Sequence, residues 1–152
     1  NPNIHYVIAG RGNLESYLDE LSKELNIEKQ VHLLGFRTDI SELYRISDIF
    51  CFPSYREGLS LSLMEVMASG LSVVCSDIRG NCDLIKHQKG GYRCNPSDAD
   101  EFIRYIDELI KDNSKRKNMA IYNKEFINAF SIDVVKDNMK TIYEKEVVVL
   151  CR

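Results

Sequence analysis

The chain has 152 residues, of which 44% are hydrophobic and 28% are charged, a balance typical of one soluble globular domain with a sizeable core. Its formal net charge is −3 and it has no block rich in lysine or arginine, which argues against nucleic acid as a partner. It also lacks an apolar run of the roughly 20 residues that a membrane-spanning helix needs. We therefore expect neither a transmembrane segment nor a signal peptide.

Short apolar runs alternate with amphipathic stretches along the chain. Near-continuous apolar runs predict buried strands, at residues 5–9, 31–34, 49–52, 71–75 and 91–94. Helical spacing and end signals predict helices, at residues 14–25, 42–46, 64–69, 84–85, 98–110, 115–130 and 134–146. The alternation predicts an α/β fold, a doubly wound Rossmann-like parallel sheet of at least five strands with helices on both faces. In such a sheet, ligands bind beyond the carboxyl ends of the strands.

Glycines follow the first predicted strand as Gly10-Arg-Gly12, which raises the possibility of dinucleotide binding. That fingerprint requires a third glycine where this chain has Glu15, and an acidic residue at the end of the second strand, where it has Gly35. Both requirements fail, so NAD is not expected. What remains is a tight turn that either lets the backbone approach a ligand or is purely structural.

The segment from Pro53 to Gly70 carries the strongest signals for function. Proline has no amide hydrogen and ends the third strand, and the glycine after Ser69 ends the helix. Glu57 and Glu65 therefore flank the start of a helix, whose free amides and positive dipole end suit a phosphate. This arrangement indicates a nucleotide-sugar site.

Both glutamates have to be weighed against structural roles. Ser62 and Glu65 have the spacing of a capping box, in which the glutamate would bind the backbone at the helix start. This role and a ligand-binding role are equally supported for Glu65, and they are compatible. Glu57 precedes Gly58 in a loop that should face the ligand, and we favour a functional role for it over that of a solvated loop carboxylate.

Arginine follows four of the predicted strands. Arg11, Arg37, Arg56 and Arg79 each lie in the loop after a strand, so in a parallel sheet they would surround one mouth and attract an anion. The alternative is that surface loops commonly carry arginine without pointing it inward.

The cysteines and histidines favour structural roles. None of the five cysteines forms a C-x-x-C pair, and reduced, buried thiols are favoured over disulfides or metal ligands. His5 and His32 fall within apolar strands, where we expect them inside the fold. His87 follows a lysine in a polar loop, where we expect exposure.

The central motif resembles the E-x7-E motif of the retaining family-4 glycosyltransferases, the glycosyl transferases group 1. It reads Glu57-Gly-Leu-Ser-Leu-Ser-Leu-Met-Glu65, followed by Val66-Met-Ala-Ser-Gly70. The family's other segments are matched at residues 10–12, 31–36, 48–54, 71–76 and 83–85, so that the resemblance covers residues 4–109. Ser72 and Cys82-Asp83 replace a proline and a Pro-Glu pair of the family pattern.

The resemblance implies the C-terminal, donor-binding half of a two-domain B-type glycosyltransferase. Residues 1–152 would form this single nucleotide-sugar-binding domain as a fragment, without the acceptor domain and without the first strand and helix of the donor domain. The full-length protein would be a hexosyltransferase that moves a sugar, with retention, from a nucleotide-sugar, expected to be a UDP-sugar, to a glycan or lipid-linked acceptor. The isolated fragment is expected to be inactive.

The resemblance also implies a setting, and it leaves two rival functions open. Bacterial polysaccharide biosynthesis is the implied process, in the cytoplasm, with the full-length protein peripheral to the inner membrane as an option. The alternatives are a sugar-nucleotide epimerase-like domain, which shares the two-domain fold, and a non-catalytic nucleotide-binding module.

Residue roles follow from motif position in the family. Glu57 would be the catalytic residue and would contact the donor sugar hydroxyls, while Glu65 would hold the ribose hydroxyls. The amides of Leu61 and Ser62 would meet the diphosphate. Phe36 and Arg37 occupy the base-contacting loop, and the further donor-binding residues are Gly10, Arg11, Gly12, Gly58, Leu59 and Ser60. The resemblance implies that no divalent metal is needed, and the sequence has no aspartate cluster that would hold one. No cofactor is expected besides the nucleotide-sugar donor.

Overall fold

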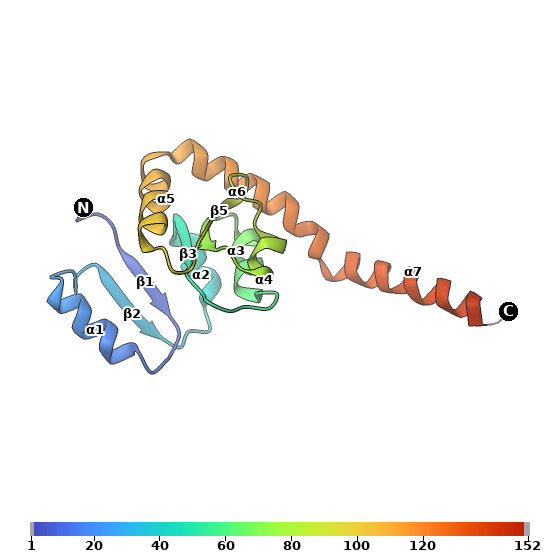
Figure 1. Cartoon of the computed structure of the whole chain (residues 1–152), viewed down its shortest axis with the longest axis horizontal. Coiled ribbons are helices and arrows are strands. Elements are labelled where there is room, and N and C mark those ends of the chain that lie inside the picture. The colour runs from blue at the N-terminus through green and yellow to red at the C-terminus, as the bar shows by residue number, and fades with distance from the viewer. Residues whose placement is uncertain (1, 151–152) are drawn as a thin grey trace. The chain divides into compact units, whose positions relative to one another are not determined.

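The computed structural model describes residues 2–150 (Figure 1), and their side chains up to residue 145. The chain forms two compact units, the first ending at Leu43 and the second beginning at Tyr44. The first unit contains β1 (Tyr6–Ala9), α1 (Glu15–Glu24) and β2 (Val31–Gly35), and α2 (Ile40–Ile46) runs on into the second. The second unit continues with β3 (Ile49–Phe52), α3 (Leu61–Ser69), β4 (Ser72–Ser76), α4 (Arg79–Leu84), β5 (Gly91–Cys94), α5 (Ala99–Lys111), α6 (Asn113–Ile127), a 3-10 turn (Asn128–Phe130) and α7 (Ile132–Leu150).

A parallel sheet in the order β3-β4-β5 forms the centre of the second unit. Every residue of β4 is buried, because successive side chains of a strand enter opposite faces and both faces are covered. On one face Val73 and Cys75 pack against residues of α3, and on the other Val74 packs against residues of α5. Helices thus cover both faces of this sheet, which confirms the doubly wound arrangement expected from the sequence.

The five expected strands are present and pair only in parallel, but they form two hydrogen-bonded sets instead of one continuous sheet. β1 pairs with β2, from Tyr6 opposite Val31 to Ile8 opposite Leu33. Within residues 2–150, no ladder joins this pair to β3. The expectation that the first strand is buried is wrong, since Tyr6 is 46% and Val7 is 39% exposed. The reason is that β1 is paired along one edge only, while α1 packs on β2.

A buried asparagine joins α6 to two loops of the second unit. The Asn123 side chain is fully buried and its Nδ2 donates to the carbonyls of Leu71 and Gly90, each at 2.7 Å. The loop comes so close that a Cβ at Gly90 would lie 2.1 Å from Asn123 Oδ1. These contacts attach the chain before β4 and the chain before β5 to the same helix.

The cysteines are arranged only partly as expected. Cys51, Cys75, Cys82 and Cys94 are free, and Cys75 and Cys94 are buried as predicted, while Cys151 lies outside the described residues. Burial raises the pKa of Cys51 to about 11.

The positions expected for two histidines are wrong. His5 is exposed and lies 3.0 Å from His32, measured from Nδ1 to Nε2. His87, expected to be exposed, is partly buried edge-on to the stacked rings of Tyr92 and Tyr105, and its Nδ1 accepts a hydrogen bond from the Arg93 amide. In the part of the chain that is described, no helix has the length and apolarity needed to cross a bilayer.

Candidate functional site

The start of α3 lies after the carboxyl end of β3 and has free backbone donors. Ser60 has the extended backbone of an N-cap residue, and its Oγ accepts from the Leu63 amide at 3.3 Å. The first backbone bond of the helix runs from the Met64 amide to the Ser60 carbonyl. The amides of Leu61 and Ser62 therefore have no acceptor within the helix, and together with the helix dipole they favour an anion.

The cap also corrects the capping-box interpretation of Glu65. The capping residue is Ser60 and not Ser62, since Ser62 already has its place within the helix. Glu65 is consequently in the second turn, too far along to bond the cap amide, and its side chain is exposed. Its Oε2 accepts a hydrogen bond from the Tyr44 hydroxyl at 3.3 Å. The structure thus removes the helix-capping explanation for Glu65.

The loop that carries Glu57 is packed tightly against the start of α4. A Cβ placed on Gly80 would lie 1.5 Å from the Gly58 carbonyl oxygen and 3.3 Å from that of Glu57. Only a residue without a side chain fits there, so Gly80 sets how closely the loop approaches α4. Glu57 itself is partly buried, and Gly58 has open space around its own Cα. Gly80 contributes to placing Glu57, although no motif pointed to it.

Replacing Gly80 with alanine is expected to displace the Glu57 loop and to lower the free energy of unfolding by about 1–3 kcal/mol, the usual cost of overpacking. The overlapping atom belongs to the backbone, so a side-chain rotation cannot relieve the contact. Thermal unfolding of Gly80→Ala beside Gly58→Ala measures this, because alanine at Gly58 meets no atom within 4 Å. Equal stability of the two variants would contradict the close approach.

The carboxyl ends of β4 and β5 add polar residues at the edge of the same sheet. Asp77 and Asn95 directly follow the two strands, and with Arg93, Pro96 and Glu101 they line a hollow. Arg93 pairs with Asp77 at 3.5 Å. No sequence motif pointed to these residues, since Arg93 lies within β5 and not in the loop after it.

The first unit holds the remaining predicted site residues at the ends of β1 and β2. The Gly10 amide donates to the Gly35 carbonyl at 2.7 Å, and both glycines have positive φ, 145° and 62°. Phe36 is 70% exposed. Arg37 forms a two-pronged bond with Asp39 at 2.7 and 2.5 Å, which holds the pKa of Asp39 below its usual value. The ion pair with Asp39 was not foreseen.

The predicted residues therefore fall into two groups, one in each unit. Gly10, Arg11, Gly12, Phe36 and Arg37 belong to the first unit, and the residues from Glu57 to Glu65 belong to the second. Within each unit the arginines follow strands, Arg11 and Arg37 in the first and Arg56 and Arg79 in the second. The convergence of all four around one mouth stays a prediction.

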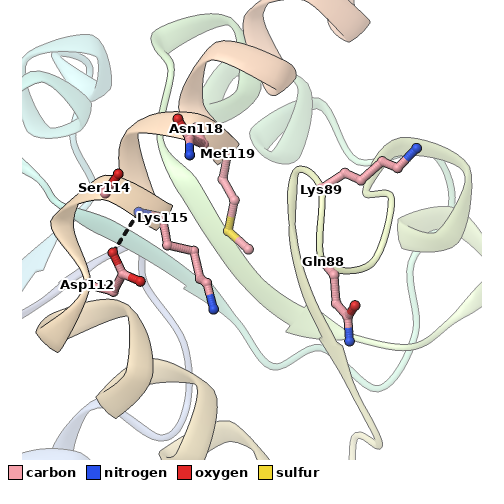
Figure 2. Close-up of a pocket in the computed structure, with 7 residues that line it drawn as sticks. All are labelled: Gln88, Lys89, Asp112, Ser114, Lys115, Asn118 and Met119. Atoms are coloured by element: carbon pink, nitrogen blue, oxygen red, sulfur yellow. Dashed lines mark hydrogen bonds between the residues drawn. The ribbon is translucent and has the colours of Figure 1, made fainter.

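A separate depression lies at the start of α6 (Figure 2) and includes none of the predicted residues. Its lining comes from α6, the residue before it and the loop before β5 (Figure 2): Gln88, Lys89, Asp112, Ser114, Lys115, Asn118 and Met119. Asp112 caps the helix by accepting from the Lys115 amide at 2.8 Å, and the Lys115 ammonium pairs with Glu108. Asp112 and Lys115 are thus engaged in contacts within the protein, and the depression contains no residue of the candidate site.

A parallel α/β unit with helices on both faces and a free helix start beyond a strand end defines a domain of the doubly wound class. Comparison with known proteins identifies the family within this class. Residues 1–126 match the family model of the glycosyl transferases group 1, and the chain belongs to this family.

Relatives and solved structures agree with this assignment. The chain is 32% identical over 143 residues to an Escherichia coli UDP-Gal:alpha-D-GlcNAc-diphosphoundecaprenol alpha-1,3-galactosyltransferase, covering 93% of the chain and 37% of that protein. It is 30% identical over 115 residues to a Campylobacter jejuni N,N'-diacetylbacillosaminyl-diphospho-undecaprenol alpha-1,3-N-acetylgalactosaminyltransferase, covering 76% and 31%. Among solved structures, Anabaena Alr3699/HepE in complex with UDP superposes with a TM-score of 0.82 at 25% identity, covering 97% of this chain and 42% of that one. The chain thus spans about two fifths or less of the length of these proteins.

Proposed function

We propose that this chain is the donor-binding domain of a retaining glycosyltransferase that transfers a sugar from a UDP-sugar to a glycan or lipid-linked acceptor. The observation that carries the proposal is the start of α3, where Ser60 caps the helix and leaves the amides of Leu61 and Ser62 free between Glu57 and Glu65. We assign sugar transfer to this site because the chain belongs to the glycosyl transferases group 1. The named acceptors of the Escherichia coli and Campylobacter jejuni relatives are diphosphoundecaprenol-linked, which supports a lipid-linked acceptor and work at the inner face of a bacterial membrane.

In this proposal, different residues bind the sugar, the ribose, the diphosphate and the base of the donor. Glu57 accepts hydrogen bonds from hydroxyls of the sugar and holds the ring in place, while Glu65 accepts from the hydroxyls of the ribose. The amides of Leu61 and Ser62 bind the diphosphate and stabilise the negative charge that grows on it as the bond to the sugar breaks. The acceptor oxygen bonds to the sugar on the face that the diphosphate leaves, and the proton of the acceptor hydroxyl passes to the departing diphosphate. Phe36 and Arg37 contact the base, and the backbone of Gly10-Arg-Gly12 approaches the donor.

The proposal extends to parts of the enzyme outside these residues, because the chain covers only 37% of the Escherichia coli relative and 42% of the Anabaena Alr3699/HepE chain. The family resemblance supports a further strand and helix of the donor domain and a separate acceptor domain in the complete enzyme.

Incubation of the complete enzyme with UDP-sugars, with and without a diphosphoundecaprenol-linked glycan, tests the function. Transfer of sugar that depends on the acceptor is expected. Isomerisation of the free UDP-sugar without an acceptor would show an epimerase instead. Binding of the nucleotide with neither reaction would leave a nucleotide-binding module.

By themselves, residues 1–152 are expected to be inactive and to bind UDP more weakly than micromolar. Each charge-assisted hydrogen bond supplied by the rest of the enzyme contributes about 1.5–3 kcal/mol, and about 1.4 kcal/mol changes affinity tenfold. Calorimetric titration with UDP and with GDP measures this. Micromolar or tighter binding would mean that the donor site is already complete within these residues.

A further inference from the structure

A tyrosine of α2 contacts the second glutamate of the motif. The hydroxyl of Tyr44 donates to Glu65 Oε2 at 3.3 Å, across 21 positions of sequence. We propose that Tyr44 is a positioning residue that orients the Glu65 carboxylate for the two adjacent hydroxyls of a ribonucleotide. The inference rests on the proposed donor site and adds a residue that the motif does not contain.

Packing holds the Tyr44 ring independently of Glu65. The ring stands edge-on to Phe50, with centroids 6.1 Å apart and planes at 84°, and Phe50 stacks on Phe52 at 5.6 Å. All three rings pack against the core that α3 forms with the sheet. A tyrosine side chain has only two torsions, so a packed ring presents its hydroxyl at a defined point. Burial and the nearby Glu65 carboxylate raise the pKa of Tyr44 to about 12, which keeps the hydroxyl a donor at neutral pH.

Glu65, in contrast, is exposed on the surface of α3. A free glutamate on a helix surface samples several rotamers, and a ligand has to stop that motion when it binds. A donor at Oε2 restricts the plane of the carboxylate in advance, and it leaves Oε1 and the remaining lone pair of Oε2 to accept. Two neighbouring hydroxyls fit two oxygens held in one plane. The ligand class is therefore a nucleotide with both ribose hydroxyls free.

Titration of the complete enzyme with UDP and with 2′,3′-dideoxy-UDP tests the role of Tyr44. Tyr44→Phe should weaken UDP binding about 3- to 10-fold, the range of one hydrogen bond, and should leave the affinity for dideoxy-UDP unchanged. Glu65→Ala should weaken UDP binding at least as much. Adding Tyr44→Phe to Glu65→Ala should weaken it no further, because both changes remove one shared interaction.

The matched control is Tyr92→Phe, which removes another tyrosine–glutamate hydrogen bond of the second unit. Tyr92 donates to Glu108 Oε1 at 2.7 Å, and neither residue belongs to the proposed donor site. This variant should bind both nucleotides like the wild type.

The outcomes separate this inference from the proposed function. If Tyr44→Phe binds UDP like the wild type while Glu65→Ala is impaired, the positioning role is overturned and the donor site stands. If Tyr44→Phe loses affinity for UDP and dideoxy-UDP equally, the substitution acts through the fold and the positioning role is again overturned. If Glu65→Ala binds UDP normally, or the wild type does not bind UDP at all, the proposed function itself fails in that respect and the inference fails with it.

Discussion

Replacing Glu57 with glutamine is expected to lower the kcat/KM of the complete enzyme for its donor about 100-fold, while the melting temperature barely changes. A carboxylate that accepts hydrogen bonds from sugar hydroxyls contributes about 1.5–3 kcal/mol per bond, more than a neutral amide does. The fold should tolerate the change, because Glu57 lies in a loop whose approach to α4 is set by the backbone of Gly58 against Gly80. Steady-state kinetics and thermal unfolding of the same preparation give the two quantities.

Glu125→Gln is the control for this change in charge. Glu125 is exposed on α6 and has no place in the proposed donor site, so its substitution should alter neither turnover nor melting temperature. Wild-type kinetics in Glu57→Gln would remove Glu57 from the site. A clear fall in melting temperature that accompanies the fall in kcat/KM would make Glu57 a structural residue instead.

Replacing Asn123 with alanine is expected to cost the largest amount of stability among these variants, about 2–6 kcal/mol. The substitution leaves the buried carbonyls of Leu71 and Gly90 without their donor, and each unsatisfied buried group costs about 1–3 kcal/mol. A domain of this size is stable by only about 5–15 kcal/mol, so a large part of the margin is lost. Urea denaturation of residues 1–152 measures the loss as a lower midpoint.

Asn118→Ala serves as the comparison for Asn123→Ala. Asn118 is on the same helix but exposed, so its loss should change the unfolding free energy by less than about 0.5 kcal/mol. Similar midpoints for the two variants would show that the Asn123 bridge adds little to stability.

Most of the elements could be predicted from local patterns. Apolar runs located all five strands to within one residue, and the helix expected at 98–110 is found at Ala99–Lys111, with Asp98 accepting from the Glu101 amide at 3.0 Å. A buried strand is indicated by a run of apolar residues, and a helix start is indicated by a capping residue next to the first turn. Both patterns lie within a few consecutive residues. For the same reason the strand–loop–helix segment around Glu57 and Glu65 was recognisable.

The choice between equivalent local options could not be predicted. Ser60 and Ser62 are equally good capping residues by type, and the structure uses Ser60. The Gly58 carbonyl, two residues before this cap, lies against Gly80, and that contact joins segments 22 positions apart. The apolar run at β1 was likewise ambiguous, because its burial depends on which neighbours pair with it.

By itself, then, the sequence determined which segments become strands and helices, that the strands pair in parallel, and which helix start carries two glutamates. Only the tertiary structure decided which contacts surround them. Tyr44 donates a hydrogen bond to Glu65, the Glu57 loop packs against Gly80, and Asn123 donates to the carbonyls of Leu71 and Gly90. The pairs are 21 to 52 positions apart or come from different elements. Their side chains meet only because the helices pack on the sheet at particular distances, and no local pattern encodes that packing.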